Sequence, residues 1–508
     1  MFLLLLAVST IAFFFHHFYW KRRNLPPGPT PLPFLGNLHT IARNAPGYTA
    51  YVKWREQYGE VYTYWLSGVP VVAVTEYEAL QETFVKDGET YTGRLHIDFA
   101  KQLFRGGNYG IIDTDGPLWK EQRRFSLHVL RDFGVGRNLM EERVMEEVRE
   151  MCSKISADLG PQGKAPAVDF ASYLDVCIGS IINTILFGYR FEGDKLPEFF
   201  SLKNMLDKHM RLSGSPLAIL FIMFPFLRHF PPFRSVYSHM VYNRISLWKF
   251  FTEQIQEHEK DFDANAEPVD YVQAFLREMH TMEKDKAELS NYSIDQLINV
   301  CNDLWIAGME TTITTLRWGA LYMIYNPDVQ AKIHTEIDHY IGDSDREILM
   351  SDKNSLPYTS AAINEIQRVA NILPMNLLHK TTRDTTIRGY KIAKGTICIP
   401  QISVVHLDPK VFPEPHRFDP TRFLNPDGSP KKVNELMPFS VGKRQCLGES
   451  LARMELFLVF ANLMRKFKLS TTPGENPPSL EQRTGITVQP WPYKCCIEER
   501  RMTMAYNA

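Results

Sequence analysis

The sequence predicts a mainly helical α+β protein that begins with one membrane-spanning helix. Three stretches carry this prediction: an apolar run up to residue 20, a pair of short strands over 61–74, and a long apolar helix over 293–326. Helical patterns dominate the rest of the 508 residues, and the sequence shows no internal repeat. The fold class is therefore mainly α with limited β structure.

The N-terminal run is almost wholly apolar up to Phe15 and continues through two histidines and three aromatic residues to Trp20, before the first cation, Lys21. About 19 residues are enough to cross a bilayer core. A cleaved signal peptide, the alternative, would carry its cations before the apolar run. We expect an uncleaved anchor over residues 1–20, with the remainder of the chain in the cytosol by the positive-inside rule.

Two short features follow the anchor. A basic, proline-rich linker over residues 21–33 ends in NLPPGPTPLP, whose prolines cannot continue a helix. Residues 61–66 and 69–74 then read as two strands joined by the two-residue turn Ser67-Gly68. This spacing predicts a β-hairpin.

The bulk composition excludes some classes of protein. The formal charge is -1 and the pI is near 7.0, so no basic field indicates a nucleic-acid partner. The seven cysteines are odd in number and scattered, unlike a disulfide framework, which indicates a reducing compartment. Neither a Walker-type loop nor a complete GxGxxG is present, so no nucleotide-binding module is expected.

The long helix begins at Ser293, which fits a capping box with Gln296, and it can run to Asn326 before Pro327. Such a helix would be about 50 Å long. Because it is apolar on most sides, we expect it to thread the interior.

The middle of this helix reads AGMETTITT, residues 307–315, where one glycine and four threonines weaken the helix. Threonine hydroxyls that bond back to carbonyls one turn earlier would explain the threonines without any function. Glu310 is harder to explain, because a buried carboxylate is costly unless it is paired or used. The segment is therefore a candidate functional site.

A second apolar stretch, PLAILFIMFPF at residues 216–226, is too short to span a bilayer and too apolar for an ordinary loop. Two interpretations stay open here. The stretch lies at the membrane surface, or it packs between helices.

A lone cysteine stands in the sequence PFSVGKRQCLGES, residues 438–450. Gly442 permits a turn with positive φ, Gly448 lets a large group approach the main chain, and Arg444 offers a fork of donors to a carboxylate. The helix that follows is apolar, so Cys446 would lie at a buried helix N-terminus, which favours a thiolate. A thiolate beside a flat apolar group that bears carboxylates is typical of heme ligation.

The pattern Phe439-x-x-Gly442-x-Arg444-x-Cys446-x-Gly448 resembles the heme-binding loop of the cytochrome P-450 family. The likeness covers about residues 26 to 500 and extends to the microsomal animal enzymes that oxidise drugs, fatty acids and steroids.

Two further signatures of the family occur in the expected order. Glu365 and Arg368 form its Glu-x-x-Arg motif, with Arg417 of PHRF as the third member of a buried structural ion network, and AGMETT is similar to the oxygen-activating helix segment. The resemblance implies a large helical fold with a small β-rich subdomain and one catalytic domain over 34–508.

The resemblance also implies a cofactor, heme b (iron protoporphyrin IX), with Cys446 as the metal ligand. Trp119 and Arg123 could otherwise be ordinary core and surface residues. In the family, the heme propionates bind a set of basic and aromatic side chains, which here are Trp119, Arg123, His379, Arg444 and, in addition, Arg94.

A monooxygenase is the implied activity, inserting one atom of O2 into a small lipophilic fatty acid, steroid or xenobiotic by hydroxylation or epoxidation. Glu310 and Thr311 would be the acid-alcohol pair that delivers protons. The substrate pocket would take residues from several segments: Ile112, Asp113, Asp303, Ala307, Ile372, Leu373, Leu377 and Ile486. Asp113 and Leu378 depart from the apolar residue and the proline of many relatives, and two acids in the pocket leave a polar or basic substrate group open.

The chain shows no nicotinamide or flavin site, so electrons would come from another protein. The family's partner is a membrane-bound NADPH-cytochrome P-450 reductase, aided in some cases by cytochrome b5, which implies a location in the endoplasmic reticulum membrane. Exposed cations are either its docking surface or a solvated face: Lys120, Arg124, Arg131, Lys431, Lys432 and Lys443.

Two other functions compete with the monooxygenase. A heme-thiolate fatty-acid peroxide isomerase or dehydratase needs no outside electrons, and such relatives commonly lose the acid-alcohol pair, which is intact here. A non-catalytic heme-binding sensor would need neither a proton relay nor a surface for an electron donor.

Overall fold

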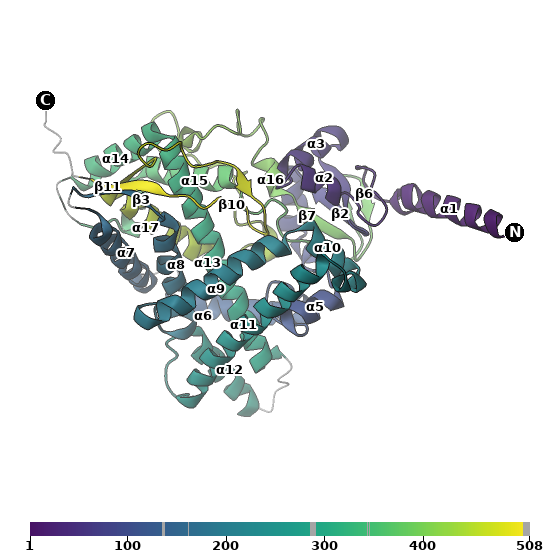
Figure 1. Ribbon diagram of the computed structural model, residues 1–508, viewed down its shortest axis with the longest axis horizontal. Helices are drawn as coiled ribbons and strands as arrows, with labels where there is room; N and C mark the ends of the chain where they lie inside the picture. The colour runs from purple at the N-terminus through teal and green to yellow at the C-terminus, as the bar shows by residue number, and fades with distance from the viewer. Residues whose placement is uncertain (135–137, 161, 285–290, 343, 345, 501–508) are drawn as a thin grey trace.

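The protein has a triangular, mostly helical body, and one helix projects from a corner of it (Figure 1). The computed structural model describes residues 1–134, 138–160, 162–284, 291–342, 344 and 346–500. The mainly helical class with small β-sheets is confirmed. The α-helices follow one another along the whole chain: α1 Phe2–Phe18, α2 Leu38–Arg43, α3 Tyr48–Tyr58, α4 Tyr77–Leu80, α5 Asp98–Arg105, α6 Gly116–Asp132, α7 Asn138–Asp158, α8 Phe170–Phe187, α9 Leu196–Ser213, α10 Pro216–Met223, α11 Phe233–Lys260, α12 Tyr271–Lys284, α13 Ile294–Tyr325, α14 Pro327–Ile341, α15 Pro357–Ala370, α16 Ile402–Val405 and α17 Glu449–Lys466.

Short helical turns and strands connect these helices. The short turns are η1 Trp20–Arg22, η2 Gln81–Lys86, η3 Gly88–Tyr91, η4 Gly193–Lys195, η5 Pro225–His229, η7 Met350–Ser355, η8 Pro420–Phe423 and η9 Gly442–Arg444. The strands are β1 Val61–Leu66, β2 Val69–Val74, β3 Lys164–Val168, β4 His379–Lys380, β5 Thr385–Ile387, β6 Tyr390–Ile392, β7 Ile397–Pro400, β8 Phe467–Ser470, β9 Gln482–Arg483, β10 Gln489–Pro490 and β11 Cys495–Glu499.

The largest sheet has the order β1-β2-β7-β4 and lies at the corner from which α1 projects (Figure 1). Its first two strands form the predicted hairpin, with Val61 opposite Val74 and Leu66 opposite Val69. Strand β7 then joins β2 in parallel, which only a long crossover connection allows. One face of the sheet packs on an aromatic cluster of α3 and β1 that includes Trp54.

Helix α13 runs through the middle of the body and is buried along most of its length, as predicted (Figure 1). The Ser293 hydroxyl accepts a hydrogen bond from the Gln296 amide at 3.1 Å, and the helix ends one residue before Asn326. The Gln296 side chain does not complete the capping box. Its amide group instead bonds both backbone groups of Gly110, so it ties α13 to the loop after α5.

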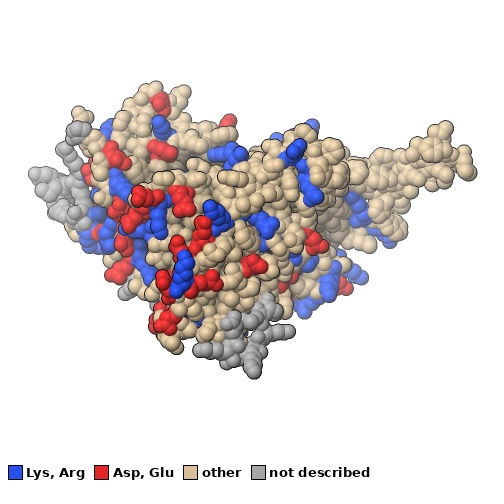
Figure 2. All heavy atoms as spheres, turned by 60° about the horizontal axis from the view of Figure 1, so that its bottom comes forward, with Lys and Arg blue, Asp and Glu red and all other residues tan. Residues whose placement is uncertain are grey.

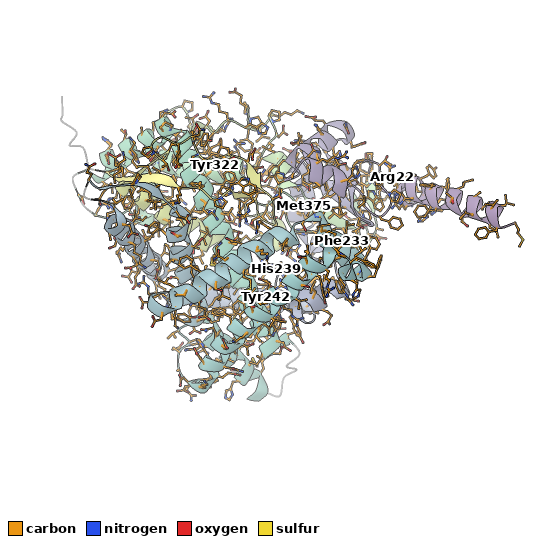
Figure 3. The ribbon with its side chains drawn as sticks, viewed as in Figure 1. Arg22, Phe233, His239, Tyr242, Tyr322 and Met375 are labelled. Atoms are coloured by element: carbon orange, nitrogen blue, oxygen red, sulfur yellow. The ribbon has the colours of Figure 1, made fainter. Side chains whose placement is uncertain are left out.

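Helix α1 projects from the body and carries no charged side chain, as Figure 2 shows. The segment Phe2–Arg22 is long and apolar enough to cross a membrane, and only 6% of its apolar window is buried. Helix α8 passes the same test of length and composition, but 67% of its window is buried in the core. Figure 3 places Arg22 where α1 meets the body, and there its guanidinium donates to the Gly28 carbonyl at 2.9 Å.

The apolar stretch 216–226 packs in part between helices, and its contact with a membrane surface stays a prediction. Ala218 and Phe221 of α10 are fully buried and pack near α11. Phe226 of η5 is 62% exposed. Phe34 of the linker region contacts both Phe13 of α1 and Phe224, so this stretch lies beside the base of the N-terminal helix.

Candidate active site

Cys446 lies between η9 and α17 and differs from every other cysteine of the chain. All seven cysteines are described and free, and only the side chain of Cys446 is exposed. Its amide donates to the Phe439 carbonyl at 2.9 Å, which closes the loop. Gly442 has φ +79°, and a Cβ there would lie 1.8 Å from the Phe84 carbonyl oxygen, so only glycine fits. The loop therefore presents one accessible thiol on a rigid turn.

The environment of the Cys446 thiol acts on its ionisation in two directions. Partial enclosure by protein raises its pKa above the ordinary value. A hydrogen bond from the Gly448 amide and the charge of Arg123 favour the thiolate. The helix that follows begins at Glu449, and Gly448 is its N-cap.

Three arginines expected at the cofactor make their hydrogen bonds to backbone carbonyls. Arg444 donates to the Thr92 carbonyl at 2.7 and 2.9 Å. Arg94 donates to the carbonyls of Ile112 and Leu378, both at 2.9 Å. Leu378 thus accepts a hydrogen bond from Arg94 through its backbone carbonyl. Leucine can do this as well as the proline that many relatives carry at this position.

None of these guanidiniums forms an ion pair with a carboxylate in the part of the chain that the structure describes. Arg123 donates to the Gln445 carbonyl at 2.6 Å. Burial lowers the pKa of Arg94 to about 10 and that of Arg444 to about 8. Neighbouring cations lower these pKa values further, Arg123 at Arg94 and Arg94 at Arg444, whereas the charges of Asp113 and Asp115 oppose the shifts. Buried cations that form no direct ion pair with a described carboxylate fit a ligand that carries two carboxylates, as the propionates of heme do.

Trp119 and His379 adjoin the same cations. The Trp119 ring lies 3.7 Å from the guanidinium carbon of Arg444. The His379 Nδ1 donates to the Tyr91 carbonyl at 2.7 Å. Burial and the neighbouring charge of Arg94 hold the pKa of His379 well below its ordinary value, so this imidazole stays neutral.

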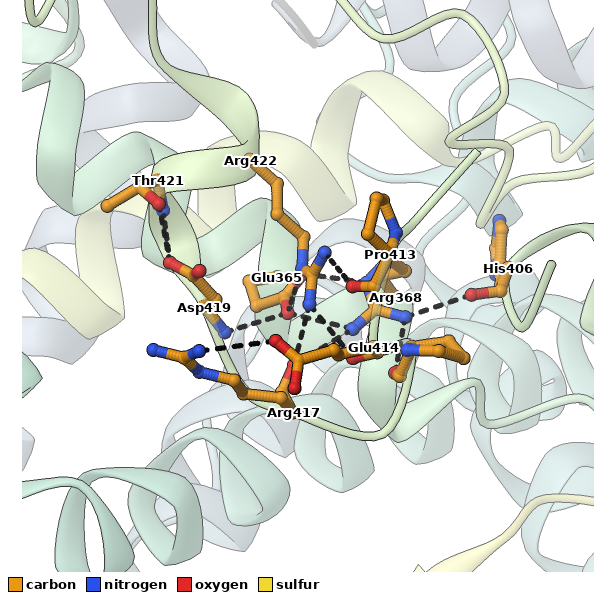
Figure 4. A network of polar contacts seen from close by, with 10 residues as sticks. Glu365, Arg368, His406, Pro413, Glu414, Arg417, Asp419, Thr421 and Arg422 are labelled. Carbon is orange, nitrogen blue, oxygen red and sulfur yellow. Dashed lines mark hydrogen bonds and ion pairs between the residues drawn. The ribbon is translucent and has the colours of Figure 1, made fainter. Parts of the chain in front are cut away.

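Glu365 and Arg368 of α15 form a fully buried ion pair, shown in Figure 4. Arg368 donates from Nε to Glu365 Oε2 at 2.7 Å and from Nη2 to Oε1 at 2.8 Å. Its Nη1 also donates to the His406 and Pro415 carbonyls. The His406 Nε2 in turn accepts from the Met437 amide at 3.0 Å, just before the cysteine loop. The pair therefore supports that loop.

The expectation that the Arg417 side chain completes this network is wrong. Arg417 is 65% exposed and pairs with Glu414, and only its carbonyl approaches Arg368 (Figure 4). Arg422 takes the place instead, with Nε 3.3 Å from Glu365 Oε1. Arg422 belongs to PTRF, which repeats the Arg-Phe pattern of PHRF five residues later, although the sequence analysis singled out only Arg417.

Glu310 and Thr311 are adjacent in α13 but their side chains have different surroundings. Glu310 is 1% exposed, and its Oε1 accepts from Thr314 at 3.4 Å, from Thr487 at 3.2 Å and from the Gln489 amide. The half-buried Thr311 hydroxyl donates to the Ala307 carbonyl at 2.7 Å. Thr311 therefore makes the back-bond expected of a helical threonine.

The two acids of the expected pocket both pair with Arg105, which the sequence did not single out. Asp303 is buried, lies 2.5 Å from Arg105 Nη1, and accepts from the amides of Ile111 and Ile112 at 2.8 and 3.0 Å. Asp113 approaches Arg105 at 3.0 Å. Asp303 therefore offers no free carboxylate to a substrate. It holds the segment that carries Ile112.

The apolar residues expected to line the pocket are accessible in an otherwise buried region. Ala307 is exposed in the middle of α13 although its helix neighbours Ile306 and Gly308 are only partly exposed. The others are exposed or half-buried: Ile112, Ile372, Leu373, Leu377 and Ile486. A lipophilic molecule would meet mainly carbon atoms here.

Two buried polar residues near the site gave no signal in the sequence. Lys203 of α9 lies 3.5 Å from Glu310 Oε2. Glu455 of α17 accepts from the Thr312 hydroxyl at 3.1 Å, and burial raises its pKa to about 8. Both occur in helical patterns where a polar residue usually faces solvent, so only the packing reveals them.

Comparison with known proteins gives consistent matches over nearly the whole chain. The family model of Cytochrome P450 matches residues 26–497. Cytochrome P450 2C23 of Rattus norvegicus is 38% identical, covering 94% of this chain and 94% of that protein. Cytochrome P450 2J1 of Oryctolagus cuniculus is 36% identical, covering 97% and 96%. Cytochrome P450 2C8 of Homo sapiens is 36% identical, covering 94% of each.

Proposed function

The chain belongs to the cytochrome P450 family, and we propose that it oxidises a small lipophilic fatty acid, steroid or xenobiotic with electrons from an NADPH-cytochrome P-450 reductase. As a member of the family it is a heme-thiolate monooxygenase that uses heme b, O2 and a redox partner. Together with the apolar helix α1, membership agrees with an enzyme anchored in the endoplasmic reticulum membrane.

The observation that carries the proposal is the accessible Cys446 thiol close to buried arginines that form no ion pair with any carboxylate of the described residues. We assign Cys446 as the iron ligand, with the heme propionates at Arg94, Arg123, Arg444, His379 and Trp119. When bound, the heme supplies the redox chemistry for activating O2. The chain's own residues bind and orient this group and keep its surroundings apolar.

Proton supply is the task we assign to Glu310 and Thr311. Thr311 borders the accessible face of α13, while Glu310 lies among buried polar groups. Glu310 would take a proton from the solvent side and Thr311 would pass it into the pocket. Ile112, Ala307 and Ile486 would exclude water from the substrate side.

The test of the proposal is spectroscopic and catalytic. Reduced holoprotein exposed to carbon monoxide should show the red-shifted absorption typical of thiolate-bound heme. Cys446→Ser should abolish it, and Cys496→Ser, at a buried cysteine, should retain it. With reductase and NADPH, the enzyme should form an oxygen-dependent product from a polyunsaturated fatty acid. Activity with a fatty-acid hydroperoxide alone would instead indicate an isomerase or dehydratase, and neither activity would indicate a sensor.

We place the reductase at a groove beside α6 and the cysteine loop, with cytochrome b5 as an optional second donor. Lys120, Arg124, Arg131 and Lys443 line this groove, whereas Lys431 and Lys432 are exposed outside it. Cations on this face would attract an acidic partner. Reversing Lys120 and Lys443 to glutamate should reduce the salt dependence of the reduction rate, and Lys249→Glu on α11 is the matched control. An unchanged salt slope would contradict this docking surface.

Membrane orientation follows from the cations after α1. Lys21, Arg22 and Arg23 would stay on the cytosolic side, so the catalytic domain would face the cytosol. The exposed Phe226 and Phe230, beside the base of α1, would contact the membrane surface. Protease added outside sealed microsomes should therefore digest the catalytic domain, and protection would contradict this orientation.

A further inference from the structure

A groove lies on the outside of the protein between α5 and α11, which pack against each other (Figure 1). Its volume is about 830 Å³, which is within the range of sites for small molecules. Its lining comes from α5, from η5 and from one face of α11, and none of the residues assigned to the heme or to the substrate pocket belongs to it. The groove is therefore a cavity that the proposed function does not use.

The α11 wall of the groove is long and largely apolar. It runs from Tyr237 to Gln256, which is about 28 Å of helix. Val241, Ile245 and Trp248 follow one another on this wall at spacings of four and three residues, so they form one stripe along the helix. Ile245 is 62% exposed although it lies in this stripe. A long hydrocarbon chain would find a matching surface here.

The floor of the groove is part of a packed core. Phe99 of α5 and Tyr237 of α11 stack with their ring centres 6.3 Å apart. Both rings pack against a buried cluster that includes Leu103 and Met240. The apolar base is therefore formed before any ligand binds.

Helix α5 separates this groove from the candidate active site. On the groove side, Arg244 Nη1 donates to the Gln102 carbonyl at 2.7 Å and joins α11 to α5. Arg105, the last residue of α5, instead pairs with Asp303 of α13. The groove and the substrate pocket are thus two sites on either side of one helix.

Arg228 of η5 supplies a cation at one end of the groove. Its guanidinium carbon lies 5.2 Å from the ring centre of Phe99 and 5.7 Å from that of Tyr237. Its Nε donates to His229 Nε2 at 3.3 Å, and neither outer nitrogen donates to a described residue. The two rings hold the guanidinium in place and leave its outer nitrogens to a ligand, in the fork geometry that a carboxylate accepts.

The groove carries an excess of positive charge. Among the residues that the structure describes, neither Arg228 nor Arg244 forms an ion pair with an acid. Lys249 pairs with Glu253, the acid of the lining, at 3.7 Å. Two cations therefore stay uncompensated beside the apolar stripe, which favours a ligand with an anionic head and a hydrocarbon chain.

We propose that this groove binds a long-chain fatty acid in its carboxylate form, as a second ligand site separate from the candidate active site. The carboxylate accepts hydrogen bonds from the outer nitrogens of Arg228, and the chain lies along Val241, Ile245 and Trp248. Because η5 also adjoins the base of α1, a fatty acid dissolved in a membrane reaches the Arg228 end first. The inference does not depend on the proposed oxidation, since binding needs neither electrons nor O2.

Photolabelling of the full-length holoprotein tests where the acid binds. The probe is palmitic acid with a diazirine at its chain end, added to protein in phosphatidylcholine vesicles without reductase or NADPH. An azole that ligates the heme iron occupies the active-site pocket in every sample. Mass spectrometry should find the label in residues 241–256 of α11, and excess palmitate should prevent labelling whereas uncharged methyl palmitate should not. Label confined to other segments would overturn the proposal.

A variant of the cation tests the assignment of the carboxylate. In Arg228→Met the probe concentration that gives half-maximal labelling should rise about tenfold, because charge-assisted hydrogen bonds are lost. Arg234→Met removes an exposed arginine of α11 outside the groove and should leave this concentration unchanged.

A variant of the apolar stripe tests the position of the chain independently. Ile245→Glu places a carboxylate where the chain should lie and should also raise the half-maximal concentration about tenfold. Its matched control is Tyr242→Glu, since Tyr242 is 63% exposed on α11 but does not line the groove (Figure 3). Both positions are at the surface, so both variants should fold. Wild-type labelling in Arg228→Met and Ile245→Glu would overturn the site.

Vesicles that contain phosphatidylglycerol separate a fatty acid from the headgroup of an acidic phospholipid. If Arg228→Met weakens binding to these vesicles but leaves probe labelling unchanged, Arg228 serves the membrane surface and the fatty-acid site is overturned. If labelling depends on Arg228 and Ile245 but no product forms with reductase and NADPH, the proposed oxidation fails and this second site stands.

Discussion

Two buried ionic clusters of this protein differ in how completely their polar atoms are bonded. In the Glu365 cluster, both carboxylate oxygens and every nitrogen of the Arg368 guanidinium have partners. In the Lys203 cluster, formed with Asp175, Asp207 and Glu310, Glu310 Oε2 and Asp175 Oδ1 accept no hydrogen bond from the described residues. A fully bonded cluster can change only by breaking several bonds at once, so it supports structure. An incompletely bonded cluster can exchange partners, which suits a group that carries protons.

The charge balance of the two clusters points the same way. Arg368 and Arg422 face one acid, Glu365, so the cluster has no excess of negative charge. Lys203 lies within ion-pair distance of three acids, and Arg317 and Arg483 act on them from farther away. The charge balance around Glu365 does not favour protonation of its carboxylate, whereas the three acids around Lys203 favour proton uptake by at least one of them.

The largest expected effect comes from breaking the Glu365 cluster. Arg368→Met would leave the fully buried Glu365 carboxylate without its main cation, at a cost of about 3–5 kcal/mol. Urea unfolding of the full-length holoprotein measures this loss, and the carbon monoxide spectrum should weaken because the cysteine loop loses its support. Arg149→Met, which breaks the exposed pair with Glu347, should cost no more than about 0.5 kcal/mol. Equal urea midpoints for the two variants would contradict the structural role of Arg368.

Glu455 extends the comparison to a buried acid for which the described structure shows no cation partner. Burial raises its pKa from 4.5 to about 8, so over this interval the folded chain keeps a proton that the unfolded chain releases. Stability therefore falls as pH rises, by about 1.4 kcal/mol per unit for this group. Glu455→Gln should gain stability over the wild type by about 3 kcal/mol between pH 5 and pH 7.5.

Urea midpoints at the two pH values measure that gain. Glu150→Gln, on α7, removes an exposed acid and serves as the control. A wild-type-like pH slope in Glu455→Gln would show that Glu455 is not the proton-binding group.

Variants of Arg422 and Arg417 show which arginine completes the Glu365 cluster. Arg422→Met removes donors to Glu365 and to the Glu414 carbonyl and should cost about 2 kcal/mol. Arg417→Met removes only an exposed ion pair and should cost no more than about 0.5 kcal/mol. Unfolding of the two variants in urea compares them directly, and a larger loss for Arg417 would reverse the assignment.

The smallest expected effect concerns one hydrogen bond to Glu310 in the Lys203 cluster. Thr487→Val removes one donor to Glu310 Oε1 and should cost about 1 kcal/mol, because two other donors remain. Thr335→Val, at an exposed back-bonding threonine of α14, is the matched control. If Thr487→Val were as damaging as Arg368→Met, the two clusters would not differ in rigidity.

Much of the fold could be predicted from local patterns. The hairpin of β1 and β2 and the turn at Gly442 have the form that the sequence indicated, and Ser293 caps α13 as expected, without the reciprocal bond of the predicted capping box. The Glu365–Arg368 pair was also foreseeable, since residues three apart on a helix are neighbours. Their third partner was not, because PHRF and PTRF fit the same pattern and only the path of the loop selects Arg422.

In the candidate active site, too, some features could be predicted from local sequence and others depend on packing. The spacing of residues around Cys446 is enough to indicate a cofactor loop, and the exposed thiol agrees with that hypothesis. The carboxylate of Asp303 looked available to a substrate, yet packing places Arg105 and two backbone amides on it. Which groups surround a buried acid depends on elements distant in the chain, and no spacing rule encodes them.

By itself the sequence determined the features that arise between near neighbours: an apolar N-terminal helix, a long capped helix, a hairpin turn and a glycine-bounded cysteine. Only the tertiary structure decided that Lys203 faces Glu310 and that Arg422, not Arg417, faces Glu365. The physical reason is that backbone preferences act over a few residues, whereas the partner of a buried charge is chosen by the packing of whole helices and loops against one another.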